Sequence, residues 1–160
     1  MTIKVGDTLP EGRFTVMNAD GPGSISSKDL FAGKKVVLFS VPGAFTPTCS
    51  KEHLPGFIEQ VAALQAKGVD TVACMAVNDV FVMDAWGKNS GADGKVKMLA
   101  DGNGDYTKAL DLELDLSGHG LGQRGRRFAL VIDDNTCTHA FIEEAGGFTV
   151  SSAENVLANL

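Results

Sequence analysis

The alternation of apolar and polar positions divides the chain into strand-like and helix-like segments. Residues 35–41 (KVVLFSV) and 69–77 (VDTVACMAV) are continuous apolar runs rich in β-branched side chains, which are typical of strands covered on both faces. Residues 50–66 instead repeat apolar side chains at helical spacing, and Pro55 predicts an irregular first turn in this helix.

The second half of the chain continues this alternation with shorter segments. The pattern predicts a strand over 95–101 and a short helix over 105–112. Residues 127–134 (RFALVIDD) and 136–143 (TCTHAFIE) are both strand-like and are separated by little more than Asn135, which is typical of an antiparallel hairpin.

Two further helices are marked by capping residues. Asp79 is placed as the N-cap of a helix over 79–88, and Ser151 with Glu154 matches a capping box before a final helix. The resulting order of strands and helices predicts an α/β fold with a mixed central sheet and helices on both faces, a thioredoxin-like arrangement. Because no repeat, linker or low-complexity tract divides the chain, we expect one domain over 1–160.

Composition and charge exclude several classes of protein. The 160 residues carry a formal net charge of −6 and no extended basic cluster, which argues against a nucleic-acid partner. No apolar stretch approaches the roughly 18 residues of a membrane helix, and the N-terminus lacks the profile of a signal peptide. The cysteines are few and irregularly spaced, which indicates reduced thiols and neither a disulfide framework nor a metal site. We therefore expect a cytoplasmic globular protein without nucleic-acid or membrane partners.

Cys49 differs from the other cysteines because it follows a strand and falls near the first turn of the helix over 50–66. The free N–H groups and the positive dipole end at a helix start stabilise an anion such as a thiolate. Cys74 lies within an apolar run and Cys137 in a strand-like segment, so both are interpreted as structural. Thr46, three residues before Cys49, is either a hydroxyl donor to the sulfur or the N-cap of the helix.

A thiolate at Cys49 also needs a cation, which must come from elsewhere in the chain. Arg127 opens an apolar strand, where a charged side chain belongs only at a strand end or in a site. Arg124 and Arg126 are competing candidates. No second cysteine lies three positions away, and on the N-terminal side that place holds Thr46. Cys49 is therefore expected to carry out one-thiol chemistry.

His53 suggests a different chemistry. Cys49 and His53 are four residues apart on one helical face, a spacing that would suit a Cys–His nucleophile pair for acyl transfer. Pro55 disturbs this turn, however, and the sequence shows no third residue to orient the histidine. The alternative is a histidine that lines the pocket, and both interpretations stay open at this point.

The stretch PGAFTPTCSKEHLPGF resembles the active-site segment of peroxiredoxins, whose signature Pro-x-x-x-Thr-x-x-Cys is matched by Pro42, Thr46 and Cys49. The wording AFTPTCS followed by HLPGF is similar to the type II, peroxiredoxin-5-like subfamily. The segments VGDTLPEGRF, VNDVFVMDAWGK and RRFALVIDD are similar to that subfamily too. The resemblance thus covers nearly the whole chain, and it implies a thioredoxin-like fold.

The resemblance implies a thiol peroxidase that needs no cofactor other than an external thiol. In such an enzyme the Cys49 thiolate attacks the O–O bond of hydrogen peroxide or an alkyl hydroperoxide and becomes a sulfenic acid. Thr46 would hold the peroxide in line with the sulfur, Pro42 would shield the thiolate, and Arg127 would stabilise the developing charge. The substrate pocket would be completed by Thr48, Gly43 and His53.

The resemblance also bears on how the sulfenic acid is reduced. Some relatives carry a resolving cysteine in the segment matching TVSSAENVL, where this chain has Ser151 and Ser152, so a disulfide from that region is ruled out. Cys74 is expected to be too buried to replace it. We therefore expect recycling by glutathione with glutaredoxin, or by another external thiol such as thioredoxin, in a homodimer.

Two other functions stay open. In a redox sensor or thiol-modified binding protein, oxidised Cys49 would signal to a partner without turnover. In a Cys–His hydrolase, activity would depend on His53 and the substrate would be an ester. Consumption of peroxide separates the peroxidase from both.

Overall fold

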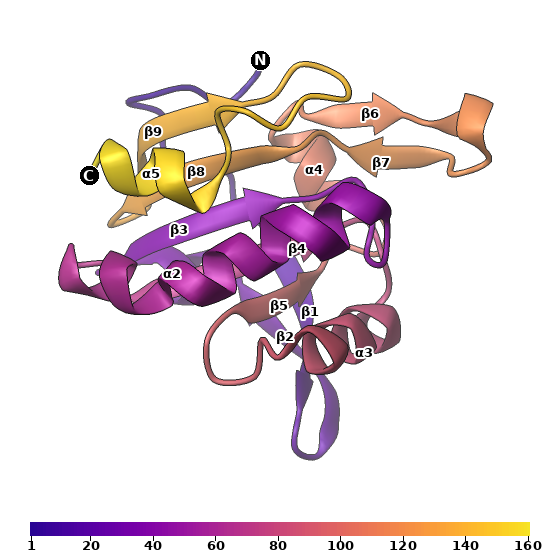
Figure 1. Cartoon of the computed structure of the whole chain (residues 1–160), viewed down its shortest axis with the longest axis horizontal. Helices are drawn as coiled ribbons and strands as arrows, with labels where there is room; N and C mark the ends of the chain where they lie inside the picture. The colour runs from indigo at the N-terminus through magenta and orange to yellow at the C-terminus, as the bar shows by residue number, and fades with distance from the viewer.

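All 160 residues are described by a computed structural model, in which seven strands form one sheet (Figure 1). The strand order across this sheet is β2-β1-β5-β4-β3-β8-β9, and two further strands form a separate ladder. The strands of the large sheet are β1 (Arg13–Asn18), β2 (Gly21–Ser26), β3 (Lys35–Ser40), β4 (Thr71–Ala76), β5 (Lys97–Ala100), β8 (Phe128–Asp133) and β9 (Thr136–Ile142). The small ladder consists of β6 (Glu113–Asp115) and β7 (Gln123–Gly125).

The strands predicted from the apolar runs form the centre of the sheet. β3, β4 and β5 are parallel neighbours, and β8 pairs antiparallel with β3 on one side and with β9 on the other. The segments 127–134 and 136–143 thus form the expected hairpin. A parallel centre with antiparallel strands at both edges is a mixed sheet, so the predicted α/β fold class is confirmed.

Helices cover both faces of this sheet, as predicted. α2, α3 and α5 contribute to a hydrophobic cluster on one face, and α1 and α4 contribute to a second cluster on the other. Figure 1 shows α2 running across the front of β3 and β4. The helices are α1 (Ser27–Phe31), α2 (Leu54–Ala66), α3 (Val80–Ser90), α4 (Asp105–Ala109) and α5 (Ala153–Ala158), with a short 3₁₀ turn at Ser117–His119.

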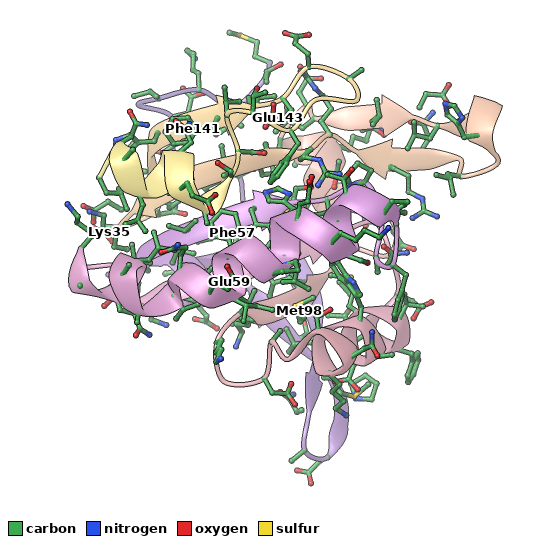
Figure 2. The ribbon with its side chains drawn as sticks, viewed as in Figure 1. Lys35, Phe57, Glu59, Met98, Phe141 and Glu143 are labelled. Carbon is green, nitrogen blue, oxygen red and sulfur yellow. The ribbon has the colours of Figure 1, made fainter.

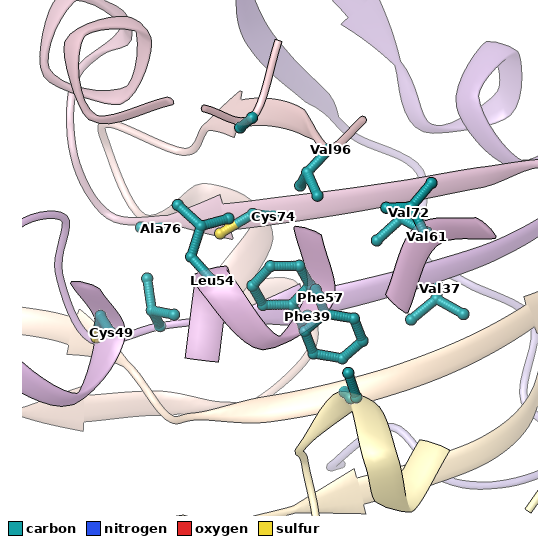
Figure 3. Close-up of a cluster of buried hydrophobic side chains, with 14 of the residues drawn as sticks. Val37, Phe39, Cys49, Leu54, Phe57, Val61, Val72, Cys74, Ala76 and Val96 are labelled. Atoms are coloured by element: carbon teal, nitrogen blue, oxygen red, sulfur yellow. The ribbon is translucent and has the colours of Figure 1, made fainter. Parts of the chain in front are cut away.

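The side chains of β3 show how the sheet divides the core in two. Val37 and Phe39 belong to the cluster that includes α2, whereas Val36 and Leu38 belong to the cluster that includes α1 and α4. Both faces of the strand are thus buried, which explains its continuous apolar run. Figure 3 shows the first cluster, in which the rings of Phe39 and Phe57 are stacked with their centroids 4.1 Å apart.

The predicted irregularity near Pro55 is confirmed. The residues Cys49–His53 form a π-helical turn, in which the Leu54 N–H donates to the carbonyl oxygen of Cys49. α2 continues this turn without a break, and Pro55, which has no N–H to donate, interrupts the ladder of intrahelical hydrogen bonds at this point. The chain therefore enters α2 with Cys49 at the start of a wider turn than an α-helix makes.

Of the two helix caps predicted from the sequence, the cap of α3 is confirmed and the cap of α5 is wrong. Asp79 caps α3 as predicted, because its carboxylate accepts a hydrogen bond of 2.9 Å from an N–H three residues later. The prediction that Ser151 caps the last helix is wrong by one residue. Ser152 is the N-cap of α5 and accepts from the Asn155 N–H at 3.2 Å, whereas Ser151 is buried and bonds to Glu143. Ser151 is thereby available to the site described below.

The sequence pattern did not predict the β1–β2 hairpin or the β6–β7 ladder. β2 (GPGSIS) contains Pro22 and two glycines, and it lies at the edge of the sheet, where a residue without an N–H is tolerated. β6 and β7 have three residues each, which is too short for a periodic signal. Among the helices, none has the length and apolar character needed to cross a membrane.

Candidate active site

The register of β3 and β8 brings the loop that carries Cys49 beside the residue that precedes β8. Ser40, the last residue of β3, pairs with Phe128, the first residue of β8. Arg127 therefore lies next to the loop that leaves β3 toward α2. Because of this antiparallel pairing, Cys49 and Arg127 meet although they are 78 positions apart.

The Cys49 sulfur is held by two polar side chains. Its Sγ lies 2.8 Å from Thr46 Oγ1, and Arg127 Nη2 donates to it at 3.2 Å. The Cys49 side chain is fully buried and lies at one end of the first hydrophobic cluster (Figure 3). Arg127 forms no salt bridge with a carboxylate, so no ion pair competes with the sulfur for its N–H groups.

Thr46 supplies a hydroxyl whose hydrogen bonding depends on the protonation of the sulfur. Its Oγ1 lies 2.8 Å from the carbonyl oxygen of Gly43 and 2.8 Å from Cys49 Sγ, but a hydroxyl has only one proton to donate. A Cys49 thiol donates to Oγ1 while the hydroxyl donates to the Gly43 carbonyl; a Cys49 thiolate instead accepts a hydrogen bond from the hydroxyl. Thr46 is therefore a partner of the sulfur and not a helix N-cap, since its hydroxyl accepts no backbone N–H.

Two backbone N–H groups at the start of the π-helical turn have no acceptor in the protein. These are the amides of Thr48 and Cys49, whereas the next amide, that of Ser50, donates to the carbonyl oxygen of Thr46 at 2.9 Å. Free N–H groups at a helix start bind anions. They lie on the segment that carries the sulfur, and they complete a set of donors suited to a negatively charged oxygen.

A cavity of about 120 Å³ lies against Pro42, Thr48 and Arg127. Arg126 and Glu143 belong to the rest of its wall. A water molecule occupies about 30 Å³ in the liquid, so hydrogen peroxide or the head of a larger hydroperoxide fits this space. Of the predicted site residues, Pro42, Thr48 and Arg127 line the cavity, whereas Gly43, Thr46, Cys49 and His53 do not.

His53 is buried beside the site and forms no hydrogen bond with the sulfur. Its Nδ1 accepts from Arg127 Nη1 at 2.9 Å, and its Nε2–H donates to the carbonyl oxygen of Ser151 at 2.9 Å. Burial, and then the charge of Arg127, lower the pKa of His53 to about 3, so the ring is neutral. Because both ring nitrogens are occupied and the ring is not basic, His53 cannot take a proton from Cys49. The Cys–His pair for acyl transfer is therefore excluded.

The two competing arginines bind elsewhere. Arg124 donates to main-chain carbonyls, the nearer at 2.9 Å, and Arg126 donates to the carbonyl oxygen of Glu143 at 2.7 Å. Neither forms a hydrogen bond with Cys49. Of the three arginines that the sequence offered, Arg127 is the one that contacts the sulfur.

Comparisons with known proteins agree with this geometry. A family model described as redoxin matches residues 4–157. Peroxiredoxin-2C from Oryza sativa subsp. japonica is 57% identical over 159 residues, and peroxiredoxin-2B from Arabidopsis thaliana is 54% identical; each alignment covers 99% of this chain and 98% of the relative. The crystal structure of reduced Prx3 from Vibrio vulnificus in complex with H2O2 is 48% identical, with a TM-score of 0.95 over 99% of both chains. The chain is a peroxiredoxin of the redoxin family.

As a peroxiredoxin, the protein is a thiol-dependent peroxidase: an enzyme that reduces a peroxide and oxidises a thiol. The likeness to Prx3 also confirms the predicted thioredoxin-like fold. Peroxiredoxins need no cofactor beyond a thiol reductant. The chemistry must then come from the side chains and amides described above.

The other two cysteines of this peroxiredoxin are buried and free. Burial, and then the nearby Cys49, raise the pKa of Cys74 well above its ordinary value. Burial, and then Asp7, raise the pKa of Cys137 to about 11. Both thiols therefore stay protonated at neutral pH, and a protonated thiol is a poor nucleophile. Cys137, which the sequence analysis interpreted as structural, belongs to the second hydrophobic cluster.

Two residues of the peroxiredoxin site were not predicted in this role. Ser151 accepts the hydrogen bond of His53 through its carbonyl oxygen, and Glu143 holds the backbone around Ser151. A main-chain acceptor leaves no mark in a sequence, because every residue has one. Glu143 is followed directly by Glu144, and no periodic signal distinguishes the buried carboxylate from its exposed neighbour.

Proposed function

We propose that Cys49 is the residue that reduces hydrogen peroxide and alkyl hydroperoxides. Its thiolate attacks one peroxide oxygen; an S–O bond forms while the O–O bond breaks, and the second oxygen leaves with a proton as water or an alcohol. Cys49 is thereby oxidised to a sulfenic acid. The observation that carries this proposal is the Cys49 sulfur, held between the Thr46 hydroxyl and the Arg127 guanidinium. Arg127 and Thr48, the residue before Cys49, also line the cavity described above.

The remaining roles follow from the same contacts. Arg127 and the free N–H groups of Thr48 and Cys49 stabilise the thiolate and the charge that develops on the leaving oxygen. Thr46 orients the peroxide through the hydroxyl that also reaches the sulfur. Pro42 contributes an apolar wall to the cavity and shields the thiolate from water. Gly43 acts indirectly, because its carbonyl oxygen fixes the Thr46 hydroxyl.

The sulfenic acid is returned to a thiol by an external reductant, for which we propose glutathione with glutaredoxin and, as another candidate, thioredoxin. A glutathione thiol displaces water from the sulfenic acid and forms a mixed disulfide; a second thiol then breaks that disulfide and releases Cys49. The burial of Cys74 and Cys137 supports this route, since both thiols stay protonated and are therefore poor nucleophiles toward the sulfenic acid. These features agree with a one-cysteine member of the type II, peroxiredoxin-5-like subfamily.

Arg126 supports an anionic reductant. It lines the cavity together with Arg127, donates to one main-chain carbonyl, and forms no salt bridge with an acidic side chain. Its remaining N–H groups can therefore bind a carboxylate in a planar, two-point arrangement. Glutathione carries two carboxylates, so this arginine is suited to guide its thiol toward Cys49.

We also propose that the enzyme is a cytoplasmic homodimer. Phe45, on the loop before Cys49, is 51% exposed, and Phe81, near the start of α3, is 65% exposed. The Phe45 ring lies against the buried Trp86 of α3 with a centroid distance of 6.4 Å, so the loop packs beside α3. A second copy that covers these rings would remove them from water. Free thiols and a glutathione reductant suit a reducing compartment such as the cytoplasm.

The first test uses variants that isolate each cysteine. Cys74→Ala/Cys137→Ala is expected to consume hydrogen peroxide with glutathione, glutaredoxin, glutathione reductase and NADPH at the wild-type rate, whereas Cys49→Ser is expected to be inactive. Activity in Cys49→Ser would overturn the assignment of Cys49. Oxidation of Cys49 without turnover under glutathione, glutaredoxin or thioredoxin would overturn the proposed reductants and favour a redox sensor.

The second test concerns Arg126. Arg126→Gln keeps a hydrogen-bond donor for the Glu143 carbonyl but removes the charge. It is expected to raise the KM for glutathione several-fold more than it slows the oxidation of Cys49 by hydrogen peroxide in a single turnover. An unchanged KM for glutathione would contradict the carboxylate-binding role.

A further inference from the structure

Glu143 has an unusual environment for a carboxylate. It is only 3% exposed, and no cation lies within salt-bridge distance of it. Its Oε2 accepts hydrogen bonds from three consecutive backbone N–H groups, those of Thr149 (2.8 Å), Val150 (2.9 Å) and Ser151 (2.8 Å), and from the Ser151 hydroxyl (2.8 Å). A buried anion that is bound only by neutral donors is costly to desolvate, so its retention calls for an explanation.

These hydrogen bonds fix the segment of residues 148–151, which connects β9 to α5. Figure 2 shows Glu143 at the end of β9, where the chain turns into this connection. The segment forms no helix or strand, and none of the backbone N–H groups of residues 148–151 donates to another backbone carbonyl. Three of these groups donate to Glu143 instead. The carboxylate therefore takes the place of the regular backbone hydrogen bonding that the segment lacks.

The fixed segment contacts the active site through Ser151. Its carbonyl oxygen accepts from His53 Nε2, and His53 Nδ1 accepts from Arg127. The direction of these hydrogen bonds is determined, because a guanidinium can only donate and a carbonyl can only accept. His53 must therefore be the neutral tautomer with its proton on Nε2, and Arg127 is left with Nη2 directed at the Cys49 sulfur.

The same segment also packs against these two side chains. The Phe148 ring lies 5.0 Å from the His53 ring, measured between centroids, and 5.7 Å from the central carbon of the Arg127 guanidinium. On its other sides His53 contacts the rings of Phe39 and Phe57. The histidine is thus held by the core on one side and by the 148–151 segment on the other.

We propose that Glu143 is a positioning residue for the peroxidase reaction, which acts through Ser151, His53 and Arg127 on the Cys49 sulfur. By fixing the carbonyl oxygen of Ser151 it selects the tautomer and orientation of His53, and His53 then holds the guanidinium so that its second N–H group points at Cys49. The proposal rests on the role proposed above for Arg127, since without it the chain of hydrogen bonds would not affect the sulfur.

The proposal makes a prediction whose sign opposes simple electrostatics. Glu143→Gln removes a negative charge close to the site, and this loss alone would make a thiolate at Cys49 more favourable. If Glu143 positions Arg127, the same variant makes the thiolate less favourable, because the guanidinium is no longer held against the sulfur. The backbone pairing of the two residues, in which the Glu143 N–H donates to the Arg127 carbonyl at 3.0 Å, is unaffected by the substitution.

The experiment measures the thiolate of Cys49 directly, in the Cys74→Ala/Cys137→Ala background, so that no other thiol contributes. The rate of alkylation by iodoacetamide is followed by mass spectrometry across a range of pH, and the rate of oxidation by hydrogen peroxide is measured separately. Glu154→Gln is the matched control, because it removes the same charge from an exposed position in the first turn of α5.

Glu143→Gln is expected to shift the alkylation profile to higher pH and to slow oxidation by peroxide about tenfold, while Glu154→Gln follows the wild type. A native-like Glu143→Gln whose profile is unchanged or shifts to lower pH would overturn the proposal.

If this variant does not fold, Ser151→Ala, which removes only one of the four donors to Oε2, is expected to shift the profile in the same direction by a smaller amount. No shift in Ser151→Ala would then count against it. If the profile of Glu143→Gln shifts but the parent protein with native Glu143 does not consume peroxide, the positioning role of Glu143 stands and the proposed function of Cys49 is rejected.

Discussion

Arg127 and His53 are joined by a hydrogen bond of 2.9 Å between Nη1 and Nδ1, although 74 positions separate them in the chain. The other end of the same guanidinium reaches the Cys49 sulfur at 3.2 Å. The arginine is thus held at two points, and its planar fork is the feature that allows this. A lysine would carry the same positive charge, but its single ammonium group could not contact both His53 and Cys49.

The first prediction tests the fork itself. Arg127→Lys keeps the positive charge, but one ammonium group cannot bond to both His53 and Cys49 at the distances observed. The rate of Cys49 oxidation by hydrogen peroxide, followed by stopped-flow fluorescence, is expected to fall about 100-fold. Arg124→Lys is the control and is expected to react as the wild type does, because Arg124 donates only to main-chain carbonyls. Wild-type rates in Arg127→Lys would show that charge alone suffices.

The second prediction concerns stability at acid pH. The folded protein keeps His53 neutral down to a pKa of about 3, whereas the ordinary value is 6.5. Between these values the unfolded chain binds the additional proton, so the free energy of unfolding falls as the pH falls through this window. For one such group the loss is about 2 kcal/mol on going from about pH 7 to about pH 5. Urea unfolding of the wild type at several pH values measures it.

His53→Gln identifies the source of this pH dependence. The variant cannot be protonated at this position, so its stability is expected to vary less with pH across the same window. His119→Gln, at an exposed position, removes a histidine that does not touch Arg127 and serves as the control. Equal pH dependence in His53→Gln and the wild type would contradict the assignment.

The sequence predicted the central part of the fold well because burial on both faces leaves a plain signal. β3 and β4 are short, continuous and β-branched, and no helix of that length would be stable alone. The β1–β2 hairpin escaped prediction because β2, with Pro22 and its glycines, has little β propensity and is stabilised by pairing along β1. Edge strands of this kind are specified by tertiary contacts.

The residues of the candidate site also differ in how far the sequence could predict them. Thr46 and Cys49 are close in sequence, so their contact follows from one turn and could be inferred. Arg127 required the register of β3 and β8, and its position at a strand end was the available clue. Glu143 and Ser151 could not be inferred, because their contribution depends on an irregular connection and on a main-chain carbonyl.

The third prediction separates the hydroxyl of Thr46 from its shape. Thr46→Val keeps the branched side chain but removes the hydroxyl that lies 2.8 Å from both the Cys49 sulfur and the Gly43 carbonyl. Oxidation by hydrogen peroxide is expected to slow at least tenfold, since one hydrogen bond to a charged group is lost. Thr46→Ser restores the hydroxyl and is expected to recover most of the rate. Equal rates in the valine and serine variants would show that the hydroxyl is not used.

The fourth prediction concerns selectivity among the thiols. Burial raises the pKa of Cys74, and burial with the nearby Asp7 raises that of Cys137 to about 11, so neither is a thiolate at neutral pH. Iodoacetamide is expected to modify the folded protein at Cys49 alone, and all three cysteines after unfolding in guanidinium. Peptide mass spectrometry locates the label. Earlier labelling of Cys74 or Cys137 would show that the core around it opens more readily than its burial indicates.

The fifth prediction tests the proposed homodimer through its apolar surface. Phe81→Glu places a charge on a position that is 65% exposed in the single chain, so it should not disturb the fold of the protomer. In a dimer that covers this surface the same charge would be buried without a partner, and dissociation is expected. Val5→Glu, at a position that is 61% exposed in the N-terminal segment, is the control and is expected to keep the wild-type assembly state. Sedimentation velocity distinguishes the two variants, and an unchanged sedimentation coefficient for Phe81→Glu would place the contact between subunits elsewhere.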